Sequence, residues 1–214
     1  MTTKDMAKIT FNLVVLYVIG GLIMAFVYAK TSPIKFQKEK AEKEAALKLM
    51  MPEADEVAKL DDWEIHKKHA EYYVARKCGE IKIINIKDEK TGEMTEKKEC
   101  LNPQDIGYIV EGYGKGYSSY IHVLSSVDKN FVLQKISILG HGETPGLGDE
   151  IEEDYFLNQF VGKVADNLVV IKGETEDKIQ AITGATISSR AVAEDGVKNG
   201  VLMLKEKLSG EVQG

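Results

Sequence analysis

The sequence predicts an α+β protein in which a single N-terminal transmembrane helix precedes one domain with a mostly antiparallel sheet and flanking helices. Three observations predict this architecture. Residues 9–29 are apolar and uncharged. Residues 108–140 are rich in β-branched and aromatic residues with interspersed glycines, which is typical of strands joined by turns. Near the C-terminus, apolar residues recur at helical spacing at Val197, Val201, Leu204 and Leu208.

Chain length, charge and cysteine content exclude several classes of protein. The 214 residues are enough for one anchor and one domain with a single core. Acidic residues outnumber basic ones by 34 to 28 and alternate with them, so no nucleic-acid partner is expected. The two cysteines, Cys78 and Cys100, form no Cys-x-x-Cys or Cys/His cluster. A zinc site or iron–sulfur cluster held wholly by this chain is therefore not expected.

The apolar run at residues 9–29 is predicted to be a retained transmembrane helix, preceded by a short tail of residues 1–8. As a helix it spans about 31 Å, close to the hydrocarbon thickness of a bilayer. A cleaved signal peptide would have a shorter apolar region and a cleavage site with small residues, whereas this run ends in bulky Phe26, Val27 and Tyr28. Lysines follow the helix more often than they precede it, which favours a cytoplasmic domain, but long domains translocate largely regardless of flanking charge. The residues alone leave the side undecided.

Residues 30–52 are predicted to form a helical stalk, and residues 53–214 the domain. Ala, Leu, Lys and Glu dominate residues 35–51, and Pro52 ends the helical pattern. His66 and His69 are spaced to share one face of a further helix, where a solvated polar face is expected.

Three further elements are expected inside the domain. Residues 78–100 have an alternating pattern and a polar turn at 88–92, so they predict a β-hairpin with the cysteines near its open end. Those cysteines are either a disulfide or two free thiols. A strand is expected around 168–171, and a last helix from about 188 to 208. Gly112, Gly114 and Gly116 mark places where the chain turns sharply or something approaches its backbone.

The segment Thr183-Gly184-Ala185-Thr186-Ile187-Ser188-Ser189 is the first candidate for chemistry. Small residues let the chain turn, and Thr186 then presents a hydroxyl where a helix begins. The N–H groups of residues 187–189 are expected to face one point, which is a natural place for a phosphate bound through the Thr186 oxygen. The alternative is an ordinary N-cap threonine.

The second candidate is the segment from Gly140 to Asp149, GHGETPGLGD. Four glycines and one proline in ten residues exclude regular structure. Glu143, Thr144 and Leu147, with Gly146 between the last two, offer an acceptor, a donor and an apolar contact within a short stretch. Functional loops are often built in this way, although a flexible surface loop is the alternative.

Together these segments resemble a known family. The chain resembles the FMN-binding domain of the G subunit of the Rnf ion-translocating electron-transport complex, and it is also similar to the C subunit of the sodium-pumping NADH:quinone reductase. The resemblance covers nearly the whole chain: the anchor, LKLMMPEAD, GYGKGYSSYIHVL, ETPGLGDEI and TGATISS. It implies that a flavin transferase uses FAD to attach FMN to Thr186 as a phosphoester. One departure from the transferase-recognition pattern is Gln180, which stands where an Asp is usual.

The resemblance also implies a function. It predicts a flavoprotein subunit that relays electrons in an Rnf-type ferredoxin:NAD oxidoreductase complex, with other membrane and peripheral subunits as partners. It places the domain on the extracytoplasmic face of the cell (inner) membrane. The predicted FMN contacts are Thr183, Gly184, Ala185, Ile187, Ser188, Glu143, Thr144, Gly146 and Leu147, around the covalent site at Thr186. The alternatives are the corresponding quinone-reductase component and, from another class, a non-redox membrane-tethered binding or assembly module.

Overall fold

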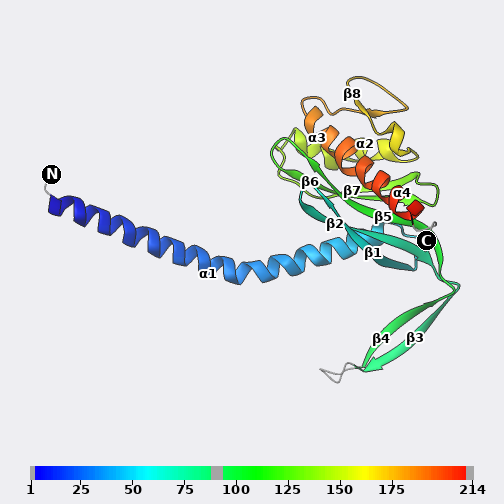
Figure 1. Ribbon diagram of the computed structural model, residues 1–214, viewed down its shortest axis with the longest axis horizontal. Helices are drawn as coiled ribbons and strands as arrows, with labels where there is room; N and C mark the ends of the chain where they lie inside the picture. Colours follow the sequence, from blue (N-terminus) through cyan, green and yellow to red (C-terminus); the bar gives the residue numbers. More distant parts are fainter. Residues whose placement is uncertain (1–2, 88–93, 211–214) are drawn as a thin grey trace. The chain divides into compact units, whose positions relative to one another are not determined.

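The computed structural model describes residues 3–87 and 94–210 (Figure 1). The turn predicted at residues 88–92 therefore lies outside the described residues. The chain forms two compact units, one ending at Ala45 and one beginning at Ala46.

The first unit is most of a single long helix, α1 (Thr3–Met50). It runs without a break through the predicted anchor and the predicted stalk, with Pro33 inside it. Pro33 has no backbone N–H, so the helix lacks one backbone hydrogen bond at this position. Within the described residues, one helical stretch, Lys8–Met50, contains a segment long and apolar enough to cross a membrane.

The second unit is built on a five-stranded antiparallel sheet, in the order β1-β2-β5-β6-β7 (Figure 1). The predicted α+β class is confirmed. The strands are β1 (Glu56–Ile65), β2 (Lys68–Lys77), β5 (Gln104–Lys115), β6 (Tyr120–Asp128) and β7 (Leu133–Gly140). Neighbouring residues of a strand face opposite sides of the sheet. On β5, Val110 accordingly joins the larger core and Ile109 a smaller one.

A continuous helical stretch from Thr186 to Gly210 covers one face of the sheet. It consists of α3 (Thr186–Arg190), a π-helical segment η4 (Ala191–Lys198) and α4 (Asn199–Gly210). It begins at Thr186 rather than at the predicted Ser188. The predicted stripe faces the core, since Val197, Val201 and Leu204 are buried and Leu208 packs against them.

Glycines on β5 allow this helix to approach the sheet closely. A Cβ on Gly114 would lie 1.8 Å from the carbonyl oxygen of Ala191, and one on Gly112 would lie 2.3 Å from that of Gly196. No side chain fits there. The expected close approach is thus confirmed for these two glycines, and the approaching group is the C-terminal helix.

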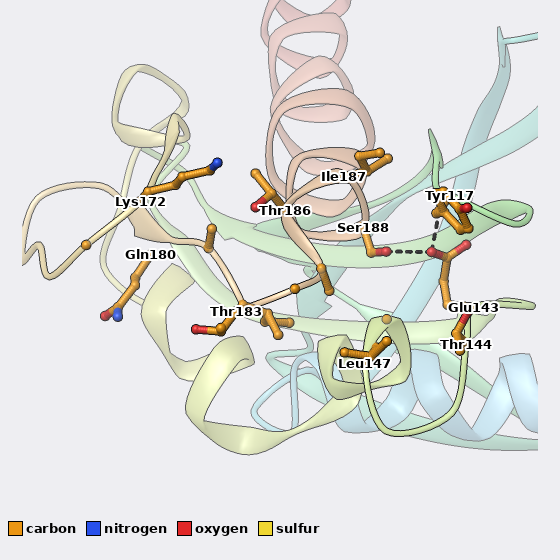
Figure 2. A pocket seen from close by; sticks show the side chains of 16 residues that line it. Tyr117, Glu143, Thr144, Leu147, Lys172, Gln180, Thr183, Thr186, Ile187 and Ser188 are labelled. Carbon is orange, nitrogen blue, oxygen red and sulfur yellow. Dashed lines mark hydrogen bonds between the residues drawn. The ribbon is translucent and has the colours of Figure 1, made fainter.

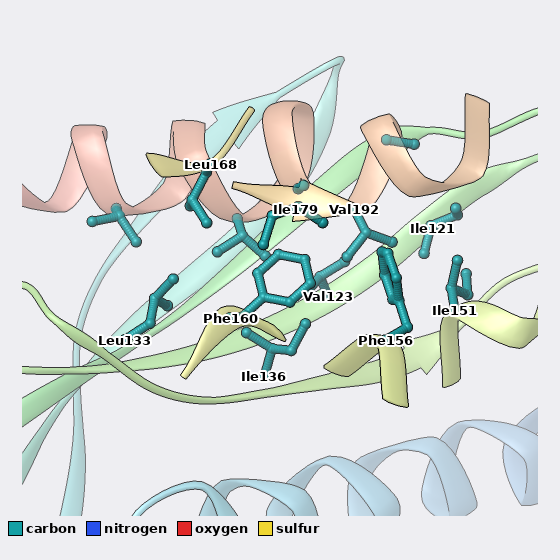
Figure 3. Close-up of a cluster of buried hydrophobic side chains, with 14 of the residues drawn as sticks. Ile121, Val123, Leu133, Ile136, Ile151, Phe156, Phe160, Leu168, Ile179 and Val192 are labelled. Carbon is teal, nitrogen blue, oxygen red and sulfur yellow. The ribbon is translucent and has the colours of Figure 1, made fainter. Parts of the chain in front are cut away.

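The larger core lies between the sheet and this helix (Figure 3). Part of it comes from the segment after β7, which contains η1 (Gly148–Glu152), α2 (Asp154–Leu157), η2 (Asn158–Phe160) and η3 (Ala165–Asn167). Phe156 and Phe160 are fully buried there, and their rings meet edge to face at 5.4 Å. On the opposite face of the sheet, the last turn of α1 contributes Leu47 and Met50 to the smaller core.

The helix expected around His66 and His69 is a wrong prediction. Those residues lie at the turn between β1 and β2 and at the start of β2. His66 and Lys67 adopt φ values of 52° and 59°, which a tight hairpin turn of two residues requires. His66 Nε2 lies 2.8 Å from the Asp195 carboxylate, so the turn is bonded to the C-terminal helix.

The predicted hairpin between the cysteines is confirmed. It comprises β3 (Glu80–Lys87) and β4 (Met94–Leu101), which pair only with each other among the described strands. Cys78 and Cys100 are disulfide-bonded, with their Cα atoms 5.3 Å apart, so the first of the two alternatives is realised. A two-stranded hairpin alone is marginally stable in water, and the disulfide closes its open end.

Candidate functional site

Two short parallel strands position the segment that contains Thr186. β8 (Val170–Ile171) pairs with β9 (Ile179–Gln180), and the Ala181 N–H donates to the Ile171 carbonyl at 2.9 Å. From β9 the chain enters a turn at Gly184, whose φ of +82° is the left-handed conformation that glycine adopts without strain. The helix begins directly after this turn.

The hydroxyl of Ser189 holds the turn together from inside. It accepts a hydrogen bond from the Ile182 N–H at 3.0 Å and donates to the Ala185 carbonyl at 3.0 Å. The Ser189 N–H also bonds to Ala185 O at 3.0 Å. It was predicted to face a ligand together with the N–H groups of residues 187 and 188. That part of the prediction is wrong, because the helix has already begun at Thr186 and position 189 has a carbonyl one turn behind it.

Thr186 is the first residue of α3 and does not occupy the N-cap position, which belongs to Ala185. Its side chain is half-buried, and its hydroxyl makes no hydrogen bond to any residue in the described part of the chain. The ordinary N-cap alternative is therefore not what the structure has. The hydroxyl is open on the side that faces a cavity.

The second segment, residues 140–149, is a tight turn. The carbonyl of Thr144 accepts hydrogen bonds from the N–H groups of Leu147 at 3.2 Å and Gly148 at 3.0 Å. Gly148 approaches the start of α3 so closely that a Cβ on it would lie 3.0 Å from Ser188 Oγ. The alternative of a flexible surface loop does not describe this ordered turn.

Glu143 connects this turn to two other segments. Its carboxylate accepts backbone hydrogen bonds from Tyr117 at 3.0 Å, Ser118 at 3.0 Å and Ser119 at 3.2 Å. The hydroxyl of Ser188 donates to it as well (Figure 2). Burial by itself raises the pKa of Glu143, but the bonds from Ser188 and the three backbone N–H groups outweigh it, and the pKa is lowered below its usual range. The negative charge of Glu143 is thus compensated by hydrogen-bond donors of the protein itself.

These segments enclose an open cavity of about 830 Å³ (Figure 2). The volume is in the range of small-molecule and cofactor sites. Apolar side chains on its wall stay exposed, with Leu147 at 45 % and Ile187 at 53 %. The cavity therefore combines apolar surface, an open hydroxyl at Thr186 and the first turn of a helix, which together suit a partly aromatic ligand with a phosphate.

The structure brings the predicted site residues together. Every residue predicted for the site lines the cavity except Gly146, whose φ of +74° shapes the turn. Sequence reasoning missed other lining residues, of which the larger side chains are Tyr117, Lys172, Gln180 and Ile182. Tyr117 lies in the GYGKGYSS segment that carried the resemblance, so a signal for it existed. Lys172 belongs to no motif, and Gln180 was noted only as the departure from the transferase-recognition pattern.

Comparisons with known proteins find one domain family and subunits of two kinds of oxidoreductase complex that are similar to this chain. Residues 116–201 match the FMN-binding domain family. The chain is 36 % identical over 197 residues to the G subunit of the proton-translocating ferredoxin:NAD(+) oxidoreductase complex of Clostridium ljungdahlii, covering 90 % of this chain and 88 % of that one. It is 42 % identical over 95 residues to the C subunit of the Na(+)-translocating NADH-quinone reductase of Pasteurella multocida, covering 39 % and 36 %. The same reductase component from Parabacteroides distasonis is a similar solved structure, with TM-score 0.48, 19 % identity and coverage of 78 % and 92 %.

Proposed function

Because this chain belongs to the G-subunit family of Rnf-type ion-translocating oxidoreductase complexes and carries an FMN-binding domain, it is an electron-transfer subunit, and we propose that its FMN is bound covalently to Thr186. The observation that supports this is the open hydroxyl of Thr186 on the wall of the cavity that both motif segments form. A hydroxyl there becomes a phosphoester without breaking any hydrogen bond in the described structure.

The proposed attachment balances as a phosphoryl transfer. The Thr186 oxygen forms a bond to the FMN phosphorus of FAD, the bond between that phosphorus and the bridging oxygen breaks, and AMP leaves. The hydroxyl proton goes to solvent or to the flavin transferase, which is the partner required for this step. No electrons are transferred in it.

When bound, FMN supplies one- and two-electron chemistry, and this chain's residues supply its position. Leu147 and Ile187 give apolar contact, and Thr144 and Thr183 offer hydroxyls on the same wall. Glu143 makes a different contribution from the predicted one, because its carboxylate bonds to the protein rather than facing the cavity as a free acceptor. We assign it to holding the site's three segments together.

The other subunits of the complex are the proposed partners for ion transport. Residues 9–29 of α1 contain no ionisable side chain of the kind that lines ion pathways. The alternative function, as the C subunit of a quinone reductase, is less well supported by coverage. The chain spans 88 % of its Clostridium ljungdahlii relative but only 36 % of its Pasteurella multocida relative.

We further propose that the domain lies on the extracytoplasmic side of the cell membrane, with α1 as its single anchor. The disulfide between Cys78 and Cys100 supports this side, because disulfides persist in oxidising compartments and are rare in the cytosol. The lysine count after the anchor favours the opposite side, but it does not control the transfer of long domains.

Intact mass spectrometry tests the covalent linkage. The full chain, produced with a flavin transferase, should gain the mass of FMN less one water, and Thr186→Ala should gain nothing. Thr175→Ala is the control, since it removes a threonine hydroxyl between β8 and β9 that does not line the cavity, and this variant should stay fully modified. An unmodified wild-type chain would instead support the non-redox binding or assembly module. A yellow Thr186→Ala chain that loses its flavin on denaturation would support non-covalent FMN.

A further inference from the structure

Lys172 stands out among the residues that line the cavity because of its charge. In the described part of the chain, it and Glu143 are the charged residues on that wall. The charge of Glu143 is taken up by three backbone N–H groups and the Ser188 hydroxyl. Lys172 makes no ion pair or hydrogen bond with any described residue. The cavity wall therefore has one uncompensated charge, and it is positive.

The backbone of Lys172 is held firmly in place. It directly follows β8, whose Val170 N–H donates to the Glu194 carboxylate at 2.7 Å. Ile171 is bonded through its carbonyl to the Ala181 N–H, on the strand that leads to Thr186. Gly173 then takes a φ of +110°, so the chain turns away immediately after Lys172. These contacts tie Lys172 both to the helix that starts at Thr186 and to the segment that precedes it.

The side chain reaches from this position toward Thr186. Figure 2 shows the ammonium end of Lys172 directed toward the Thr186 side chain, across the part of the cavity farthest from Leu147 and Tyr117. An anion attached to the Thr186 oxygen would thus lie between that ammonium and the first turn of the helix. Both favour negative charge, the first by its formal charge and the second by its unpaired N–H groups.

We propose that Lys172 binds the phosphodiester that joins FMN to Thr186. It acts as a positioning residue: it neutralises the single negative charge of the diester and fixes the direction in which the flavin leaves the helix. This inference rests on the proposed covalent site, and it goes beyond it by assigning a phosphate ligand from a segment with no recognised motif. The ammonium has no role in electron transfer itself.

The test compares single-charge variants of the full chain, produced with a flavin transferase and purified in detergent. Lys172→Gln removes the proposed ligand, and Lys172→Arg retains its charge. Lys178→Gln is the matched control, because Lys178 is an exposed lysine between the same two strands and does not line the cavity. The readouts are the intact mass and the ³¹P NMR resonance of the attached FMN, with the guanidinium-unfolded protein giving the resonance of an uncontacted diester.

We expect Lys172→Gln to move the ³¹P resonance toward the unfolded position, while Lys178→Gln and Lys172→Arg keep that of wild type. High salt should also move the wild-type resonance in that direction and leave Lys172→Gln unchanged. Loss of attachment in Lys172→Gln alone, with a native circular dichroism spectrum, supports the same role toward the phosphate of FAD. A wild-type resonance in Lys172→Gln overturns the inference, as does a change confined to the flavin reduction potential. A wild-type chain with no FMN mass refutes the covalent site instead.

Discussion

Replacing Glu143 by Gln should destabilise the domain, because both carboxylate oxygens accept hydrogen bonds and an amide has only one oxygen that can accept them. One carboxylate oxygen accepts the N–H groups of Ser118 and Ser119, and the other accepts the Tyr117 N–H and the Ser188 hydroxyl. An amide oxygen can replace only one of them. If it serves Ser118 and Ser119, the amide NH₂ faces the Tyr117 N–H, and two donors oppose each other.

The magnitude follows from counting these bonds. The substitution removes one hydrogen bond to a charged acceptor, at about 1.5–3 kcal/mol. It also removes the charge from the two bonds that remain, which roughly halves each of them. The Ser188 hydroxyl can rotate and accept from the amide, so its bond is largely kept. Together these changes predict a loss of about 2–4 kcal/mol in the free energy of unfolding.

Urea unfolding of the full chain in detergent at pH 7 measures this loss, with the fluorescence of Trp63, the sole tryptophan, as the signal. The pKa of Glu143 is lowered in the folded state. Its stabilising contribution is therefore complete above the pKa of the unfolded state, about 4.3, and declines as the pH falls through the lower folded value. The stability difference between wild type and Glu143→Gln should therefore shrink as the pH falls below the unfolded-state value.

Two outcomes would contradict this reasoning. One is a loss below about 0.5 kcal/mol at pH 7, the size typical of surface substitutions. The other is a difference between the two proteins that stays constant across the acidic range. Glu153→Gln is the control, since Glu153 is exposed and its side chain makes no hydrogen bond or ion pair in the described structure, and the unfolding free energy of this variant should stay close to that of wild type across the acidic range.

Three further predictions concern other parts of the chain. Leu147→Asp should shift the absorption spectrum or reduction potential of the attached flavin without preventing attachment. Leu202→Asp, on a similarly exposed leucine of α4, should leave both properties unchanged. If Leu147→Asp has the flavin properties of wild type, residues 140–149 do not contact the flavin. Gly114→Ala should cost about 3 kcal/mol or more in urea unfolding, because its Cβ would overlap the helix backbone, whereas Gly140→Ala, with open space around it, should be nearly neutral. A cysteine placed at exposed Lys129, in a variant without the native cysteines, should react with a membrane-impermeant reagent in intact cells or spheroplasts; reaction only after lysis would put the domain in the cytoplasm.

The elements that were predicted correctly have strong local signals. Residues 9–29 form one uninterrupted apolar run, residues 108–140 are rich in β-branched and aromatic residues, and the stripe from Val197 to Leu208 repeats at helical spacing. The region of His66 and His69 failed because β1 and β2 carry mixed polar patterns, with one face of β1 mostly exposed. A short spacing between two histidines does not distinguish a helix from a hairpin turn.

Local sequence also placed Thr186 and the ETPGLG turn, because glycines and a proline restrict the backbone wherever they occur. It could not determine which groups those segments meet. Glu143 was predicted to face a ligand, yet in the fold it bonds to the backbone of the segment after β5 and to Ser188. Those partners lie more than twenty residues away along the chain, and only the packing of the turn on α3 brings them within hydrogen-bond distance.

Local sequence patterns were enough to predict the long apolar N-terminal helix, the α+β class and the residues that form the two motif segments. The tertiary structure alone decided that these segments enclose one cavity, that Cys78 and Cys100 are bonded and that Lys172 belongs to the cavity wall. The physical reason is the range of the interactions. Periodicity and backbone restrictions act over a few residues and are written in the local sequence. Contacts such as the pairing of β8 with β9 depend on where the whole chain returns, and no short stretch of residues encodes that.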